Sequence, residues 1–245
     1  MSYLNTLLFG YYPYVAMSVF IIGSIARYDR DQYTWRTGSS QLLRAKELRL
    51  GSNLFHIGIL LLFVGHFVGL LTPPAIYHGL GLSTSAKQIL AVVAGGIFGG
   101  ICAKGIYILI RRRLTDARIR ATSSRMDIFI LLLIGVQLAL GLLTLPISLY
   151  HSDGANMILL SEWAQRIVTF RSGAADQISN IGIIFKLHLF LGMTIFLVFP
   201  FSRLVHVWSG LATIGYVFRP YQVVRSRRLN VPAGHNLPRQ PGAGV

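Results

Sequence analysis

Four histidines lie in or directly beside long apolar stretches of this 245-residue chain. His56 and His66 belong to the uncharged run 51–71, and His188 and His206 belong to a second apolar stretch near the C-terminal end. Ionisable side chains at membrane depth are costly and usually have a function. Imidazole is a common metal ligand, so two pairs on two stretches favour a metal-binding role over the alternative of hydrogen-bonded packing.

The elements that carry these histidines are predicted to be membrane helices. Hydrophobic residues make up 53% of the chain and charged residues 13%, and the mean hydropathy is +0.57, whereas soluble domains average about 25% charged residues. Stretches of about 20 apolar residues match the ~30 Å hydrocarbon core of a bilayer. We therefore expect an all-α membrane protein with five transmembrane helices at Leu4–Ala26, Gly51–Leu71, Ile89–Ile110, Ile128–Ile147 and Ile181–Ser202.

The basic residues predict the orientation of these helices. Of the 23 Lys and Arg residues, 18 lie in segments 27–49, 111–125 and 203–245. This alternation follows the positive-inside rule and predicts an outer N-terminus and a cytoplasmic C-terminus. The net charge of +15 thus indicates a lipid bilayer and not nucleic acid. The basic inner loop is a topology signal beside anionic lipid, a docking surface for a cytoplasmic partner, or both.

Two parts of the chain are distinguished by composition. Residues 1–228 are predicted to form the five-helix transmembrane domain. Residues 229–245 form a tail that is rich in proline and glycine, has little to bury, and is predicted to be disordered on the cytoplasmic side.

Helix direction determines which histidines can meet. The second helix runs outward and the fifth runs inward, so His56 matches the depth of His206, and His66 matches that of His188. We call His56 and His206 the inner pair, and His66 and His188 the outer pair. Two imidazoles from facing helices suit the axial positions of a haem iron, whereas zinc or copper needs three or four converging ligands.

Two b-type haems between the second and fifth helices are therefore the predicted cofactors. The single cysteine, Cys102, excludes a CxxCH haem attachment and a Cys-ligated iron–sulfur cluster within the chain. Glycines on the two helices would leave room for flat macrocycles or would equally serve helix packing; they are Gly58, Gly65, Gly69 and Gly192.

The unequal spacing of the histidines predicts a distortion of the fifth helix. His56 and His66 are ~15 Å apart along an ideal helix, but His188 and His206 are ~27 Å apart. A kink at Pro200, with a distortion over 199–202, would absorb part of this difference.

Basic residues near the helix ends are candidate partners for haem propionates. Arg203 and Arg112 are the inner candidates and Lys186 is the outer one. The same residues would also extend toward lipid headgroups with no haem present.

The sequence resembles a known family, the gamma (cytochrome b) subunits of respiratory nitrate reductase. The resemblance covers most of residues 3–225 and is densest in RYDRDQYTWR, SSQLL, SNLFHIGILLLFVGHFVGLLTP, ALGLLTLPIS and KLHLFLGMTIFLVFPFSRLVHVWS. It implies a five-helix anchor in the cytoplasmic (inner) membrane, with His56 and His206 on the haem nearer the cytoplasm and His66 and His188 on the outer haem.

The resemblance also implies the activity and the partners. A membrane quinol would be oxidised near the outer haem, and the electrons would pass to an iron–sulfur beta subunit and a molybdenum-containing alpha subunit on the cytoplasmic side. Lys87 matches the family's quinol-site lysine, and Gly65 lies beside the outer haem ligand. The chain departs from the family pattern by one extra residue in the loop before Lys87 and by its longer tail.

Two other functions are compatible with the sequence. One is a related cytochrome b anchor of another cytoplasmic reductase, of the sulfur or heterodisulfide type. The other is a haem-free membrane anchor or transporter in which the histidines only pack.

Overall fold

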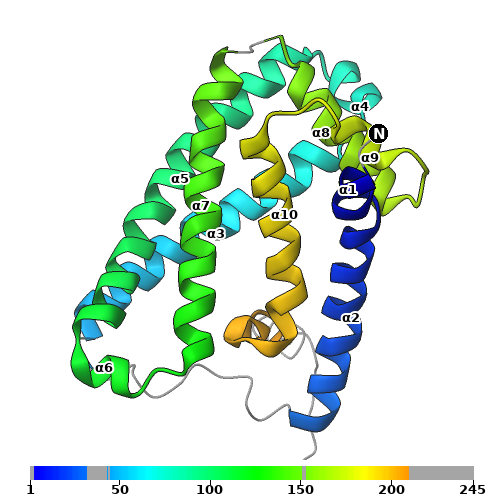
Figure 1. Ribbon diagram of the computed structural model, residues 1–245. Helices are drawn as coiled ribbons and strands as arrows, with labels where there is room; N and C mark the ends of the chain where they lie inside the picture. The colour runs from blue at the N-terminus through cyan, green and yellow to red at the C-terminus, as the bar shows by residue number, and fades with distance from the viewer. Residues whose placement is uncertain (1–2, 32–42, 44, 151–152, 210–245) are drawn as a thin grey trace, which may run out of the picture. The chain divides into compact units, whose positions relative to one another are not determined.

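A computed structural model describes residues 3–31, 43, 45–150 and 153–209. The predicted tail, residues 229–245, and the predicted domain boundary at residue 228 lie outside this part of the chain. Every regular element in the described residues is helical, and five helices are long and apolar enough to cross a membrane (Figure 1). Helices satisfy their own backbone hydrogen bonds, which the bilayer interior requires.

The five spans contain the predicted stretches almost entirely. The first span, Tyr3–Arg30, combines α1 (Tyr3–Thr6), a π-helical turn η1 (Leu7–Tyr11) and α2 (Tyr12–Asp31); the others are α3 (Ala45–Leu71), α5 (Thr84–Thr115), α7 (Arg125–Tyr150) and α10 (Ile183–Val198) with η4 (Phe199–Phe201). Short helices connect them: α4 (Pro74–Gly79), α6 (Ala117–Ala121), α8 (Ala155–Val168) and α9 (Ala174–Ile178).

The helices pack in a chain of neighbours: α3 on α5, α5 on α7, α7 on α10, and α10 on α2. The most extensive interface joins α3 and α5, where glycines let the backbones approach closely. A Cβ at Gly58 would lie 2.6 Å from that of Cys102, and one at Gly105 would overlap the backbone of Phe55. Gly58 therefore serves helix packing, one of its two predicted roles.

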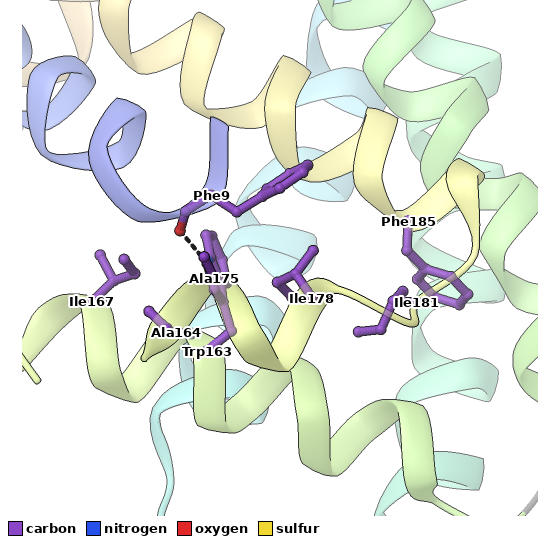
Figure 2. Close-up of a cluster of buried hydrophobic side chains, with 9 residues drawn as sticks. Phe9, Trp163, Ala164, Ile167, Ala175, Ile178, Ile181 and Phe185 are labelled. Carbon is purple, nitrogen blue, oxygen red and sulfur yellow. Dashed lines mark hydrogen bonds between the residues drawn. The ribbon is translucent and has the colours of Figure 1, made fainter. Parts of the chain in front are cut away.

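A buried apolar cluster joins α8 and α9 to the start of the first span (Figure 2). Pro13 has no N–H, so the carbonyl of Phe9 four residues earlier loses its α-helical donor. The indole Nε1 of Trp163 donates to this carbonyl at 2.9 Å. The side-chain amide of Asn5 donates a second hydrogen bond, to the carbonyl of Ala175 at 2.7 Å. We call α8 and α9 the cap.

The predicted distortion at the end of the fifth helix is confirmed and is larger than a kink. After α10 ends at Val198, the chain makes the 3₁₀ turn η4, an extended residue at Ser202 (φ −116°, ψ 177°) and a second 3₁₀ turn, η5 (Arg203–Val205). Pro200 cannot donate a backbone hydrogen bond to Phe196, which accepts instead from the N–H of Phe199. We call residues 199–202 the break.

The first span holds the break in place. Nη1 of Arg27 donates to the carbonyls of Pro200 at 2.6 Å and Ser202 at 2.9 Å. A Cβ at Gly23 would lie 2.9 Å from the ring of Pro200, so the two segments are in close contact. Arg27 thus satisfies carbonyls that the interrupted helix no longer satisfies by itself.

Candidate functional site

The four histidines come together in two pairs across α3 and the C-terminal part of the chain. The ring centroids of His56 and His206 are 6.1 Å apart with an interplanar angle of 76°. Those of His66 and His188 are 6.0 Å apart with an interplanar angle of 40°. These are the two pairs that helix direction predicts, and their role as ligands stays a prediction.

Each imidazole has one nitrogen bonded to a backbone carbonyl. Nδ1 of His56 lies 2.7 Å from the carbonyl oxygen of Ser52, that of His66 lies 2.7 Å from Leu62, that of His188 lies 3.2 Å from Gln137, and that of His206 lies 2.6 Å from Arg203. A carbonyl oxygen only accepts, so Nδ1 carries the proton in all four rings. In the neutral form of each ring, Nε2 therefore has a lone pair that can bind a ligand.

The centroid separation in both pairs is the one expected of two imidazoles that bind one metal ion. Two nitrogens that bind opposite sides of one ion at about 2 Å each lie about 4 Å apart, which puts the ring centres about 6 Å apart. The Nδ1–H to carbonyl bond is the usual support for a metal-binding histidine. Within the described residues, His, Cys, Asp and Glu form no group of three or more that could hold a metal, so the donor set differs from that of a zinc or copper site.

Other predicted glycines differ in their surroundings. A Cβ at Gly65 or Gly69 would meet no atom within 4 Å, so the surface of α3 is open at these two positions. A Cβ at Gly192 would lie 3.2 Å from Nε2 of Gln137. Gly65 and Gly69 thus lie on an open surface of α3, whereas Gly192 lies against α7.

Lys87 occupies the first turn of α5, whose N-cap is Ser83. Its side chain is buried, and Nζ lies 4.1 Å from the ring centroid of Tyr77. This is a cation–π contact, and the ammonium has no hydrogen bond or ion pair with any residue in the described part of the chain. The hydroxyl of Tyr77 lies 3.4 Å from that of Thr84. Sequence reasoning found Lys87 but not Tyr77.

Lys87, Gly65 and the outer pair lie toward the same end of the bundle. Gly65 and His66 are within two turns of the end of α3 at Leu71, and His188 is within two turns of the start of α10 at Ile183. Gln165 of the cap donates to the carbonyl of Leu70 at 3.1 Å. The cap therefore packs at the end of the bundle where α5 begins, and Lys87 lies in the first turn of that helix.

The predicted propionate partners have other contacts. Arg112 is buried and donates to the carbonyl of Leu43 at 2.6 Å, and Lys186 donates to that of Ser179 at 2.8 Å. Arg203 lies 3.8 Å from the carboxylate of Asp127, whose other oxygen is 3.8 Å from Arg113. The backbone carbonyl of Arg203 also accepts the hydrogen bond from Nδ1 of His206.

Asp127 is placed by the start of α7. Its backbone N–H donates to Oγ of Ser124 at 3.0 Å, and its carboxylate accepts from the N–H of Ser124 at 3.3 Å. This reciprocal arrangement is a capping box. It places one carboxylate between Arg113 and Arg203.

Comparison with known proteins places this arrangement in a family. The family model described as nitrate reductase gamma subunit matches residues 5–227. The chain is 52% identical over 227 residues to the respiratory nitrate reductase 1 gamma chain of Escherichia coli (strain K12), covering 93% of this chain and 100% of that one. It is 38% identical over 221 residues to the nitrate reductase gamma chain of Bacillus subtilis (strain 168), covering 90% and 98%.

A third relative is longer than this chain. The nitrate reductase-like protein NarX of Mycobacterium tuberculosis (strain CDC 1551 / Oshkosh) is 34% identical over 217 residues, which are 88% of this chain and 33% of that protein. The family model and the first two relatives match the chain over nearly its whole length. The chain belongs to the nitrate reductase gamma subunit family and is a multi-pass membrane protein.

Proposed function

We propose that this chain oxidises membrane quinol near its outer face and passes the electrons through two b-type haems to the cytoplasmic subunits of respiratory nitrate reductase. The observation that carries the proposal is the arrangement of the inner and outer pairs. In each pair the centroids of the two rings lie about 6 Å apart, and every Nδ1 is bonded to a carbonyl. Membership of the gamma subunit family favours this reading over another reductase anchor or a haem-free anchor.

His56 and His206 would hold the inner haem, and His66 and His188 the outer one. A bound b haem supplies reversible one-electron chemistry at its iron. The Nδ1–H to carbonyl bonds fix each ring in one tautomer and raise the basicity of Nε2. Gly65 and Gly69 would leave space beside His66. Arg203, Arg112 and Lys186 are proposed to donate hydrogen bonds to propionates in addition to their present contacts.

Lys87 is proposed to bind the quinol, with Gly65 leaving space for the quinol ring. The buried ammonium lies against Tyr77 and can donate hydrogen bonds to a quinol oxygen. A cation at that oxygen favours loss of its proton. Each quinol that becomes a quinone gives up two electrons and two protons, and the protons leave toward the outer side.

The orientation is inferred from the charge distribution, and the partners are inferred from membership of the gamma subunit family. An outer N-terminus would direct the basic segments 27–49 and 111–125 toward the cytoplasm, where they would dock an iron–sulfur beta subunit bound to a molybdenum-containing alpha subunit. The protein would lie in the cytoplasmic (inner) membrane. Each electron that crosses inward against the membrane potential costs about 2.3 kcal/mol per 100 mV, so the acceptor potential must exceed that of the quinol.

A reduced-minus-oxidised optical spectrum of the purified protein, with a count of haem per chain, tests the proposal. We expect a b-type spectrum and two haems per chain, and co-purification of the alpha and beta subunits from the native membrane. A chain purified from that membrane without a b-type band would overturn the haem assignment. Loss of quinol oxidation in a Lys87→Ala variant that keeps both haems would support the quinol site, and full activity would refute it.

A further inference from the structure

His188 is supported differently from the other three histidines. Nδ1 of His56, His66 and His206 is bonded to a carbonyl three or four residues earlier in the same segment. Nδ1 of His188 is bonded instead to the carbonyl of Gln137, which belongs to α7. The orientation of this one ring therefore depends on a neighbouring helix.

The side chain of Gln137 reaches the other nitrogen of the same ring. Its Nε2 lies 3.5 Å from Nε2 of His188, at the long limit of a hydrogen bond. Because Nδ1 carries the proton, Nε2 of His188 is an acceptor, so the amide turns its NH₂ end toward the ring. Oε1 of Gln137 is buried and makes no hydrogen bond with the described residues. Leaving a buried acceptor unsatisfied is costly. Within the described residues, the side-chain amide of Gln137 makes its hydrogen-bond contact with His188.

One turn further along α7, Gly141 leaves space for the same imidazole. A Cβ at this position would lie 3.0 Å from Cε1 of His188 and 3.6 Å from both ring nitrogens. Gln137 and Gly141 are four residues apart and so share a face of α7. The ring of His188 thus packs on one face of α7, against the carbonyl and the amide of Gln137 and against Gly141, which has no side chain.

We propose that Gln137 and Gly141 are positioning residues for His188, which set the orientation of its ring and thereby the incorporation and the midpoint potential of the outer haem. This inference rests on the proposed function, since it assumes that His188 is an axial ligand. The carbonyl of Gln137 fixes the tautomer and Gly141 admits the ring. Iron on Nε2 would replace the long amide contact, and the amide would keep the positive end of its dipole beside the ligand.

The direction of each effect follows from the geometry. A methyl group at position 141 displaces the ring by a few tenths of an ångström or more, so haem is bound less completely at the outer site. A positive dipole end beside the site favours the reduced state, which carries one positive charge less. Replacing the amide of Gln137 with an apolar side chain therefore lowers the outer midpoint potential.

The test compares Gly141→Ala and Gln137→Leu with a matched control in the complete complex. The control is Gly135→Ala on the same helix, where a Cβ would meet only the terminal methyl groups of Ile110 and Ile106, at 3.2 and 3.8 Å. The readouts are haem per chain and a potentiometric titration followed optically. The component that His66→Ala removes identifies the outer haem.

We expect Gly141→Ala to reduce haem content by up to twofold, from two per chain toward one, with the loss confined to the outer component. Gln137→Leu should keep both haems and lower only the outer potential, and Gly135→Ala should change neither. Equal changes in the content or potential of both haems would indicate a general packing defect and would overturn the inference. The inference would also be overturned if both variants kept two haems per chain with unchanged potentials. Absence of haem from the unmodified protein would instead refute the proposed function.

Discussion

The inner and outer pairs reach almost the same ring separation, 6.1 and 6.0 Å, by different means. In the inner pair each Nδ1 bonds within its own segment, but His206 meets His56 only after a break in the helix. In the outer pair His188 lies on a regular helix and takes its carbonyl from α7. One site is thus set by an interrupted backbone and the other by a neighbouring helix.

The difference follows from the spacing of the histidines. On straight helices His56 and His66 would be ~15 Å apart, and His188 and His206 would be ~27 Å apart. A distortion of the fifth helix absorbs part of this difference. The distortion of this helix lies beside His206 of the inner pair, where Arg27 donates to the carbonyls of Pro200 and Ser202. A change near the break should therefore affect the inner pair alone, and a change in α7 the outer pair alone.

Removal of one ligand from each pair should produce the largest effects. His66→Ala should leave one haem per chain, the inner one, and abolish quinol oxidation, because the outer pair loses its iron ligand. His56→Ala should leave only the outer haem and block transfer to the cytoplasmic subunits. Haem counts and potentiometric titration check both variants. Retention of two haems in either one would contradict the pairing.

Arg27→Met is expected to give the next largest effect, confined to the inner pair. The substitution removes a charged donor from two carbonyls of the break, and a hydrogen bond to a charged group contributes about 1.5–3 kcal/mol. The inner haem should be partly lost while the outer haem stays at one per chain. Arg30→Met, at an exposed position one turn along, is the matched control. Selective loss of the outer haem would refute the role of the break.

Much of this arrangement could be predicted from sequence. Apolar length predicts the five spans, and the alternating direction of the helices predicts which histidines meet. The orientation in the membrane that the basic segments indicate stays a prediction. The unequal spacing with Pro200 predicts where the fifth helix is distorted. Each of these inferences uses only local composition or ideal helix geometry.

The supports of the histidines could not be predicted in the same way. Arg27 and Pro200 are 173 residues apart, and no periodicity relates them. Gln137 did carry a signal, since it is an amide in the middle of an apolar span, but its partner depends on how α7 and α10 pack. The contact of Tyr77 with Lys87 depends on the short helix α4, which apolar length does not predict.

Tyr77→Leu should have a smaller effect than loss of a haem and should act on the quinol and not on either pair. A cation–π contact contributes about 1–2 kcal/mol when partly desolvated, so the KM for quinol should rise about 5–30-fold as Lys87 loses its position. Tyr77→Phe keeps the ring and should behave as the unmodified protein. Steady-state kinetics with a soluble quinol analogue measure this. Equal losses in the two variants would assign the effect to the hydroxyl and contradict the cation–π role.

The smallest effect is expected for Ser52→Ala, and it bears directly on how the two pairs differ. Nδ1 of His56 lies 2.7 Å from the carbonyl oxygen of Ser52 and 3.2 Å from its hydroxyl. The substitution removes only the longer contact, and the ring keeps its orientation through the carbonyl of its own helix. Haem content should stay at two per chain with both potentials nearly unchanged, whereas Gly141→Ala displaces a ring that depends on another helix. The contrary result would be a loss of inner haem in Ser52→Ala as large as the loss of outer haem in Gly141→Ala. The inner pair would then depend on side-chain support as much as the outer pair does. The contrast between an interrupted backbone and a neighbouring helix would no longer explain the two sites.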